Sequence, residues 1–246
     1  MSNSEAYTLE GWLSIRAALI AKSRDVHEIL LEQGKTNARL DALKKRAKEQ
    51  GVPLRLVSRA DLDREAEGQT HGGALAHVGP RKFKDLDELG RGPSAPFLAL
   101  LDGVEDPYNF GQAVRALHAA GAHGVVVRPR NWTSAAATVA RASAGSTEFM
   151  PMAVVESDEA LVAHLRARAI QLVCTDLGKQ TTSLFDAKLT SPLLVAIGGE
   201  RRGVSKTLLK NADLALQIPY GRNFKQSLGT TAATSVVAFE IMRQRG

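Results

Sequence analysis

The feature that most constrains the fold of this chain is a regular alternation of strand-like and helix-like segments after residue 97. Strands are predicted at 97–101, 125–128, 152–155, 170–175, 193–197 and 214–218, and helices at 109–120, 133–142, 158–169 and 228–243. Such alternation is typical of an α/β fold with a mainly parallel sheet, covered by helices on both faces. Ligands of these sheets bind beyond the carboxyl ends of the strands. We therefore expect chemistry in the loops after Leu101, Thr175, Ile197 and Ile218.

A smaller α/β unit precedes this region. It is predicted to contain helices at 9–22, 36–50 and 61–67 and strands at 26–31, 54–57 and 73–78. Residues 79–96 concentrate proline, glycine and charge, as linkers do. The sequence thus predicts an amino-terminal domain over 1–78, a linker over 79–96 and a larger domain over 97–246.

Composition bears on the partner and on the compartment. A formal net charge of +6 and a pI near 9.6 suggest a polyanionic partner, although many basic proteins bind none. The one cysteine, Cys174, ends an apolar segment, which indicates a buried thiol in a reducing compartment. The N-terminus does not resemble a signal peptide, and no apolar run approaches the roughly 20 residues that span a bilayer. We expect a cytoplasmic protein without a membrane partner.

The first segment with candidate functional residues is the loop that enters the helix at 109–120. It contains the pattern Asn109-x-Gly111-x-x-x-Arg115. Asn109 is predicted to cap the helix, and Arg115 lies inside it. A helix N-terminus with a nearby arginine favours anion binding. The alternative is an ordinary capped helix with an arginine on its surface.

The second segment, Gly198-Gly199-Glu200-x-x-Gly203, directly follows a buried strand. It does not match a nucleotide-binding P-loop, because Val204 and Ser205 follow Gly203 where that motif has a lysine and a hydroxyl residue, and the lysine is displaced to Lys206. Either it is a glycine-rich turn from strand to helix, or its backbone approaches a ligand closely while Glu200 accepts a hydrogen bond or orients an arginine.

The third segment runs from Ile218-Pro219 to Ser227-Leu228 and enters a helix rich in alanine and threonine. Small residues from Gly229 to Ser235 allow close packing against another backbone. Arg222 and Lys225 are either solvated charges or phosphate contacts.

These three segments, in this order, resemble the motifs of the SPOUT superfamily, and specifically of the SpoU/TrmH family of RNA ribose 2′-O-methyltransferases. The resemblance covers residues 97–246. It implies a trefoil-knotted α/β domain that binds S-adenosylmethionine in the knot and forms a homodimer through it. The amino-terminal unit, with His71-Gly-Gly-Ala-Leu-Ala, resembles the ribosomal-protein-like RNA-binding domain of several family members. That likeness implies that residues 1–78 recruit the RNA substrate.

The resemblance also implies which residues form the site. Those expected to bind the cofactor are Thr175, Gly178, Gly198, Gly199, Gly203, Ile218, Pro219 and Leu228. Those expected to act in catalysis are Arg115, Asn109, Glu200 and Ser227. A guanidinium is normally never deprotonated in proteins, so we expect Arg115 to bind a phosphate and stabilise the developing alkoxide rather than act as a base. No His, Cys and Asp cluster has the spacing of a metal site, and no metal is expected.

One position departs from the family pattern, and two other functions stay open. The third motif usually reads Ser-Leu-Asn, and here it reads Ser227-Leu228-Gly229. The missing amide leaves open a catalytically silent RNA-binding or assembly factor with the same fold. A methyltransferase of the doubly wound type would need a glycine-rich loop after an early strand, which Asp102-Gly-Val-Glu-Asp-Pro-Tyr does not supply. Ribosomal RNA is the favoured substrate, with transfer RNA second.

Overall fold

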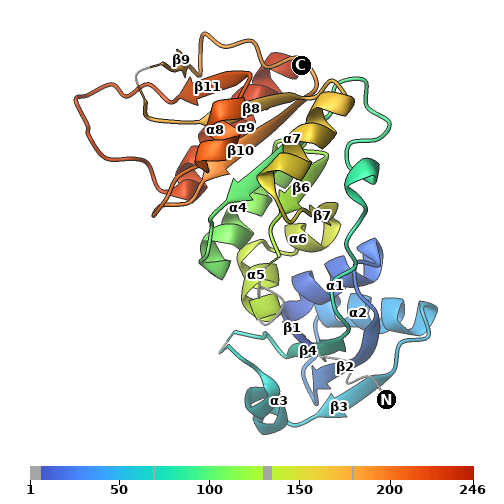
Figure 1. The fold of residues 1–246 in the computed structure, drawn as a ribbon. Helices are drawn as coiled ribbons and strands as arrows, with labels where there is room; N and C mark the ends of the chain where they lie inside the picture. Colours follow the sequence, from blue (N-terminus) through green and yellow to red (C-terminus); the bar gives the residue numbers. More distant parts are fainter. Residues whose placement is uncertain (1–6, 69, 130–134, 179) are drawn as a thin grey trace. The chain divides into compact units, whose positions relative to one another are not determined.

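A computed structural model describes residues 7–68, 70–129, 135–178 and 180–246 of the chain. Two compact units are present (Figure 1). Unit 1 consists of residues 1–82 together with 130–149, and unit 2 consists of residues 83–129 together with 150–246. Among the described residues, no helix is long and apolar enough to cross a membrane.

Unit 2 is built on a seven-stranded sheet of order β7-β6-β5-β10-β8-β11-β9. Its strands are β5 (Phe97–Asp102), β6 (Gly124–Val127), β7 (Met152–Val154), β8 (Gln171–Thr175), β9 (Thr182–Ser183), β10 (Leu193–Gly198) and β11 (Leu214–Gln217). Each neighbouring pair in this order is parallel. The prediction of a mainly parallel sheet is confirmed, and its order places β10 between two strands that precede it in the chain.

Helices cover both faces of this sheet. Their bounds are α4 (Pro107–Ala119), α7 (Asp158–Ala167), α8 (Lys206–Asn211) and α9 (Thr230–Arg245). Leu98 and Leu100 of β5 join one buried cluster with side chains of α7 and α8. Because side chains alternate along a strand, the neighbouring residues of β5, which are also buried, face the opposite side. The helices α4 and α9 pack side by side, and α9 contacts β10.

Unit 1 contains a four-stranded sheet of order β1-β4-β2-β3 and helices on it. The elements before residue 82 are β1 (Tyr7–Glu10), α1 (Gly11–Ala21), β2 (Val26–Glu32), α2 (Ala38–Glu49), β3 (Leu54–Val57), α3 (Arg59–Glu65) and β4 (Ala74–Val78). The strands β2 and β3 are parallel and the other pairs are antiparallel. Asn37 caps α2, and Ser58 and Asp61 form a capping box on α3.

The segment between β6 and β7 belongs to unit 1, which the predicted domain limits do not include. It contains α5 (Ala136–Ala142) and α6 (Ser146–Phe149). Ala136 and Ala140 are buried in the core cluster formed by α1, α2 and the sheet of unit 1. A Cβ on Gly145 would lie 2.8 Å from Cβ of Ala17, so the turn between α5 and α6 packs directly on α1.

Buried polar contacts tie this segment to the rest of unit 1. The Glu148 carboxylate is 1% exposed and accepts hydrogen bonds from Ser23 Oγ at 2.5 Å and Arg24 Nε at 3.2 Å. Arg141 Nη1 donates to Glu10 Oε2 at 2.7 Å. Charges buried in this way are stable only when they are paired, so unit 1 requires residues that come late in the chain.

Several local predictions are wrong at element boundaries. Asp106, not Asn109, caps α4: its Oδ1 accepts the Asn109 N–H at 2.7 Å, and Pro107 takes the first helical position. Residues 7–10 form a strand where a helix was predicted to begin, because Gly11, with φ +80°, separates β1 from α1. Within 79–96, predicted as a linker, Leu86–Glu88 form the 3-10 turn η1, and Leu89 is buried in the core of unit 2.

Cys174 tests the burial of the central strands. Burial, and then the negative charge of Asp102 and of three further aspartates, raises the pKa of its thiol to about 12. We expect no reaction with an aromatic disulfide reagent at mildly alkaline pH in the native protein, and stoichiometric reaction once guanidinium unfolds it. Rapid labelling of the native protein would contradict this packing.

Glu240 gives a prediction on acid stability. Bidentate hydrogen bonds from Arg243, and a further one from Gln244, lower the pKa of Glu240 from its ordinary 4.5 to about 2. The folded protein therefore holds a stabilising carboxylate above pH 4.5, and its contribution is lost as the pH falls from 4.5 towards 2. We expect Glu240→Gln to lower the urea midpoint near neutral pH, and the difference from wild type to shrink in that window. A difference that stays constant with pH would refute this.

Candidate active site

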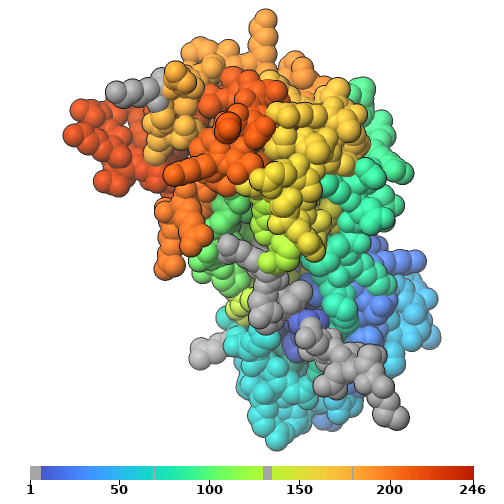
Figure 2. Space-filling view, in the orientation of Figure 1, coloured from blue at the N-terminus to red at the C-terminus, as the bar shows by residue number. Residues whose placement is uncertain are grey.

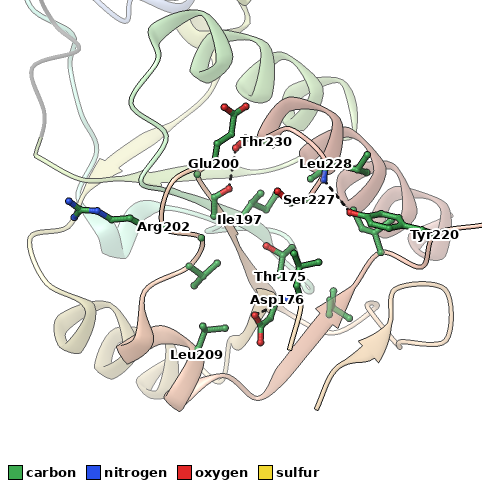
Figure 3. A pocket seen from close by; sticks show the side chains of 18 residues that line it. Thr175, Asp176, Ile197, Glu200, Arg202, Leu209, Tyr220, Ser227, Leu228 and Thr230 are labelled. Atoms are coloured by element: carbon green, nitrogen blue, oxygen red, sulfur yellow. Dashed lines mark hydrogen bonds between the residues drawn. The ribbon is translucent and has the colours of Figure 1, made fainter. Parts of the chain in front are cut away.

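The described part of unit 2 holds a cavity of about 300 Å³ at the carboxyl ends of β8, β10 and β11 (Figure 3). Thr175 ends β8 and Asp176 follows it, Gly198 ends β10, and Leu216 lies one residue before the end of β11. The cavity thus forms where the parallel sheet predicts a ligand site. Its wall combines aliphatic side chains with polar groups and exposed backbone, which is typical of small-molecule sites.

One wall consists of residues 198–204, here named the glycine loop. Glycine is required at its start, because a Cβ on Gly198 would lie 2.3 Å from the carbonyl carbon of Gly203, and a Cβ on Gly199 would lie 2.2 Å from the carbonyl oxygen of Gly103. Gly203 has a φ of +65°, which favours glycine for a different reason. Its N–H donates to the Gly199 carbonyl at 3.0 Å and closes the loop. The spacing of the second motif is therefore a steric requirement of this turn.

The opposite wall comes from the segment 218–229, here named the exposed loop. Tyr220 Oη accepts the Leu228 N–H at 3.1 Å, so the two ends of the loop are tied together (Figure 3). The Phe224 ring packs edge-on against Tyr220 with centroids 5.7 Å apart. Residues 221–227 are exposed, and Figure 2 shows this segment in orange-red on the surface of unit 2. Arg222 and Lys225 of this loop are solvated in the structure.

A second cavity, of about 430 Å³, adjoins the end of β5. It is lined by Gly103, Val104, Glu105, Asp106, Pro107, Asn109, Glu200, Arg201 and Thr230. Glu200 and Thr230 line both cavities. Thr230 Oγ1 donates to the Gly198 carbonyl at 3.2 Å, which fixes the start of α9 against the glycine loop. The boundary between the two cavities therefore has a carboxylate and a hydroxyl-bearing side chain.

Most of the residues predicted for the cofactor lie around the first cavity. Thr175, Gly198, Gly199, Gly203, Ile218 and Leu228 line it. Gly178 and Pro219 do not line it and are exposed, although each directly follows a lining residue, Leu177 and Ile218 respectively. Gly229 begins α9 without any side-chain cap, and a Cβ there would lie 3.4 Å from Glu200 Oε1.

The four residues predicted for catalysis are not gathered in one place. Glu200 and Ser227 line the first cavity, and Asn109 lines the second together with Glu200. Arg115 lies on α4, has an exposed side chain and lines neither cavity. Within one chain the structure brings together three of these residues and leaves Arg115 facing solvent.

Several lining residues were not predicted. Asp176 follows Thr175 directly at the carboxyl end of β8, so its position in the sheet could have revealed it. Thr230 and Ala233 lie one helical turn apart at the start of α9, a spacing that places both on one face. No sequence pattern pointed to Tyr220, because its role depends on the hydrogen bond that it makes across the exposed loop.

His71 has a structural position in unit 1. Its side chain is fully buried, its Nδ1 accepts the Gly73 N–H at 3.2 Å, and its Nε2 therefore donates to Asp63 Oδ1 at 2.9 Å. This hydrogen bond, followed by that of Arg59, lowers the pKa of Asp63. The described residues contain no group of three or more His, Cys, Asp and Glu that could hold a metal ion.

Comparison with known families accounts for nearly the whole chain. The sequence profile of the SpoU rRNA methylase family matches residues 96–239. A second profile, for RNA 2′-O ribose methyltransferase substrate binding, matches residues 8–84. The two matches correspond to the three motifs and to the amino-terminal resemblance respectively.

Individual relatives align along almost their full length. The 23S rRNA (guanosine-2′-O-)-methyltransferase RlmB of Shewanella oneidensis is 33% identical over 94% of this chain and 95% of that protein. The RlmB of Escherichia coli strain K12 is 31% identical over 94% of this chain and 96% of that protein. Neither relative is described as a silent RNA-binding factor.

Solved structures share the fold. The SpoU methyltransferase AviRb from Streptomyces viridochromogenes, in complex with the cofactor AdoMet, superposes with a TM-score of 0.82 at 24% identity, over 98% of this chain and 90% of that chain. An AdoMet-bound rRNA methyltransferase from Sinorhizobium meliloti gives a TM-score of 0.80 at 20% identity, over 97% and 87%. Since profiles and relatives agree on both parts of the sequence, the chain belongs to the SpoU rRNA methylase family, and the predicted enzyme class, an RNA 2′-O-ribose methyltransferase, is confirmed.

Proposed function

We propose that this enzyme transfers a methyl group from S-adenosylmethionine to the ribose 2′-hydroxyl of a guanosine in 23S rRNA. The observation that carries the proposal is the pair of adjoining cavities that share Glu200 and Thr230. One cavity would hold the cofactor and the other the target ribose. The choice of RNA rests on the names of the relatives that are more than 30% identical over most of this chain.

The residues around the first cavity fit S-adenosylmethionine. A volume of about 300 Å³ lies at the lower end of the range of about 300–1,000 Å³ for small-molecule sites. Ile218, Leu228 and the backbone at Gly198 offer a flat apolar and hydrogen-bonding wall for an adenine ring. Asp176 and Thr175 at the other side offer oxygen acceptors for ribose hydroxyls or an ammonium group. Close approach of the backbone at Gly198 requires glycine there.

When bound, the cofactor supplies a methyl group on a positively charged sulfur. The chain must then align the ribose oxygen and favour loss of its proton. We assign this orientation to Glu200, which lines both cavities and whose carboxylate can accept a hydrogen bond from the ribose hydroxyl, with Asn109 on the ribose side and Ser227 on the cofactor side. We keep Gly178 and Pro219 among the residues proposed to bind the cofactor only because each is a chain neighbour of a residue that lines the cavity.

Arg115 is proposed to act through the RNA. Its side chain is exposed on α4, two helical turns from Asn109. A guanidinium there can bind a backbone phosphate in a bidentate manner beside the target nucleotide. It would stabilise the developing negative charge without giving up a proton.

Unit 1 is proposed to recruit the RNA. The substrate-binding profile covers residues 8–84, close to the predicted domain 1–78. The Arg39 guanidinium lies 5.2 Å from the centre of the Trp12 ring, and paired cationic and aromatic side chains of this kind stack on bases. The net charge of +6 favours the phosphate backbone.

We further propose that the enzyme is a cytoplasmic homodimer and that its larger domain contains the trefoil knot of the family. Support for the dimer comes from α4 and α9, which pack side by side and carry the exposed apolar side chains Tyr108, Phe239 and Met242. Exposed apolar groups of this size favour an interface. The buried Cys174 is compatible with a reducing compartment.

The reaction is tested by transfer of labelled methyl from S-adenosylmethionine to RNA from cells that lack the protein. We expect label in a 2′-O-methylguanosine of 23S rRNA. Arg115→Ala and Arg115→Lys should each reduce transfer by roughly 100-fold, since lysine keeps the charge but not the bidentate geometry. The exposed Arg91→Lys should transfer normally. Near-full activity of Arg115→Lys would refute the bidentate role, and no transfer by wild type would refute the proposed reaction.

The dimer is tested by light scattering after size exclusion. Phe239→Asp combined with Met242→Asp should convert a dimer into a monomer, because two charges would then be desolvated in the interface. Phe185→Asp is the control, since Phe185 is also an exposed apolar side chain but lies outside α4 and α9. A wild-type monomer at micromolar concentration would contradict the proposal.

A further inference from the structure

Four polar residues form a closed ring of contacts next to the glycine loop. They are Asp102 at the end of β5, Arg128 just after β6, Asp158 at the start of α7 and Ser205 at the N-cap of α8. Arg128 Nη2 donates to Asp158 Oδ1, and Arg128 Nε lies 3.8 Å from Asp102 Oδ1. Ser205 closes the ring: its Oγ donates to Asp158 Oδ2 at 2.5 Å, and its N–H donates to Asp102 Oδ2 at 2.8 Å.

The ring is attached to both ends of the glycine loop. At its start, the Gly199 N–H donates to the backbone carbonyl of Asp102 at 2.6 Å. At its end, the N–H of Ser205, the next residue after the loop, donates to the carboxylate of Asp102. One aspartate therefore fixes the separation of the two ends, and the conformation of its carboxylate depends on Arg128 and, through it, on Asp158.

The burial of the ring makes its contacts strong and their loss costly. The side chains of Asp102, Arg128 and Asp158 are only 13%, 16% and 17% exposed. Hydrogen bonds between ionised groups are stronger in such surroundings than in water. A single guanidinium is paired with two carboxylates, so the arginine alone does not neutralise both. The N–H and the Oγ–H of Ser205 each donate a further hydrogen bond, to Asp102 and to Asp158 respectively. Removing one member leaves a largely buried charge without its partner.

No ring side chain lines the cavity, whereas the loop between its attachment points at Gly199 and Ser205 does so, for example through Glu200 and Val204. We propose that Arg128, Asp158 and Ser205 are positioning residues, which hold the glycine loop in the form that binds S-adenosylmethionine and presents Glu200. This inference rests on the proposed assignment of the first cavity to the cofactor. It adds three residues, outside the three motifs, on which cofactor affinity depends.

Ser157 provides a matched control for Ser205. Both serines are N-caps: Ser157 Oγ accepts the Ala160 N–H at 3.1 Å, and Ser205 Oγ accepts the Leu208 N–H at 3.2 Å. Ser157→Ala and Ser205→Ala therefore each remove one helix cap, with similar cost in stability. Only Ser205→Ala also removes the hydrogen bond to Asp158 and so opens the ring. A difference in cofactor affinity between the two variants therefore measures the effect of the ring and not the loss of a helix cap.

The experiment measures the Kd for S-adenosylmethionine by calorimetry, the Tm, and the KM and kcat of methyl transfer. We expect Ser205→Ala to raise Kd and KM for the cofactor about tenfold, the loss of one charge-assisted hydrogen bond, with a much smaller change in kcat. Ser157→Ala should bind like wild type despite its lower Tm, and Ser205→Thr, which keeps a hydroxyl, should restore affinity. Equal affinities of Ser157→Ala and Ser205→Ala would overturn the proposal.

A second pair of variants covers the case in which Ser205→Ala fails to fold. Asp158→Asn removes the charge that holds Arg128, and the adjacent, exposed Glu159→Gln removes a charge outside the ring. We expect a raised Kd for Asp158→Asn and an unchanged Kd for Glu159→Gln. Equal Kd values for Asp158→Asn and Glu159→Gln would also contradict the proposal that the ring positions the glycine loop.

The variant Gly198→Ala distinguishes a failure of the ring proposal from a failure of the assignment of the cavity to the cofactor. Because its Cβ would displace the backbone of Gly203 within the cavity wall, this variant should lose cofactor binding whatever the ring does. If Gly198→Ala weakens binding and the ring variants do not, the ring proposal alone fails. If Gly198→Ala binds like wild type, the assignment of the cavity fails, and the ring proposal fails with it.

Discussion

Contact between backbones with no room for a side chain determines the shape of this site. The glycine loop can turn back on itself only because Gly198 has no Cβ to meet Gly203, and it can lie against the loop after β5 only because Gly199 has none to meet Gly103. Backbone this close brings amide and carbonyl groups to the surface of a cavity, where a ligand can bind them without help from long side chains. Other parts of the site, including the position of Glu200, follow from this turn.

The order of strands decides which loops meet there. β10 lies between β5 and β8, and Gly198 pairs with Asp102 in register. The glycine loop therefore starts beside the loop that leads into α4, and on its other side lies the end of β8. Thr230 then fixes α9 against Gly198. Segments about 100 residues apart along the chain are thus neighbours because all of them leave the same edge of one parallel sheet.

Features that depend on a local sequence pattern could be predicted, and features that depend on contacts between distant residues could not. Alternating strands and helices predicted the parallel sheet, and six of the eight residues that the resemblance implied for the cofactor line the first cavity. The cap of α4 was misassigned because Asp106 and Asn109 are both good caps, and Pro107 decided between them. Tyr220 could not be predicted, since its hydrogen bond to Leu228 exists only in the closed loop. The exposure of Arg115 likewise depends on which face of α4 the sheet covers.

The segment 130–149 shows how far domain limits drawn on a sequence can differ from compact units in space. It follows β6 and precedes β7, yet α5 completes the core of unit 1 and Glu148 neutralises the buried Arg24. Without this segment Arg24 would be a buried charge without a carboxylate, and the α1 surface that packs on Gly145 would be open to water. Unit 1 therefore cannot reach its folded form until the chain has been synthesised well into the methyltransferase sequence. The chain therefore passes between unit 1 and unit 2 on both sides of segment 130–149 as well as near residue 82.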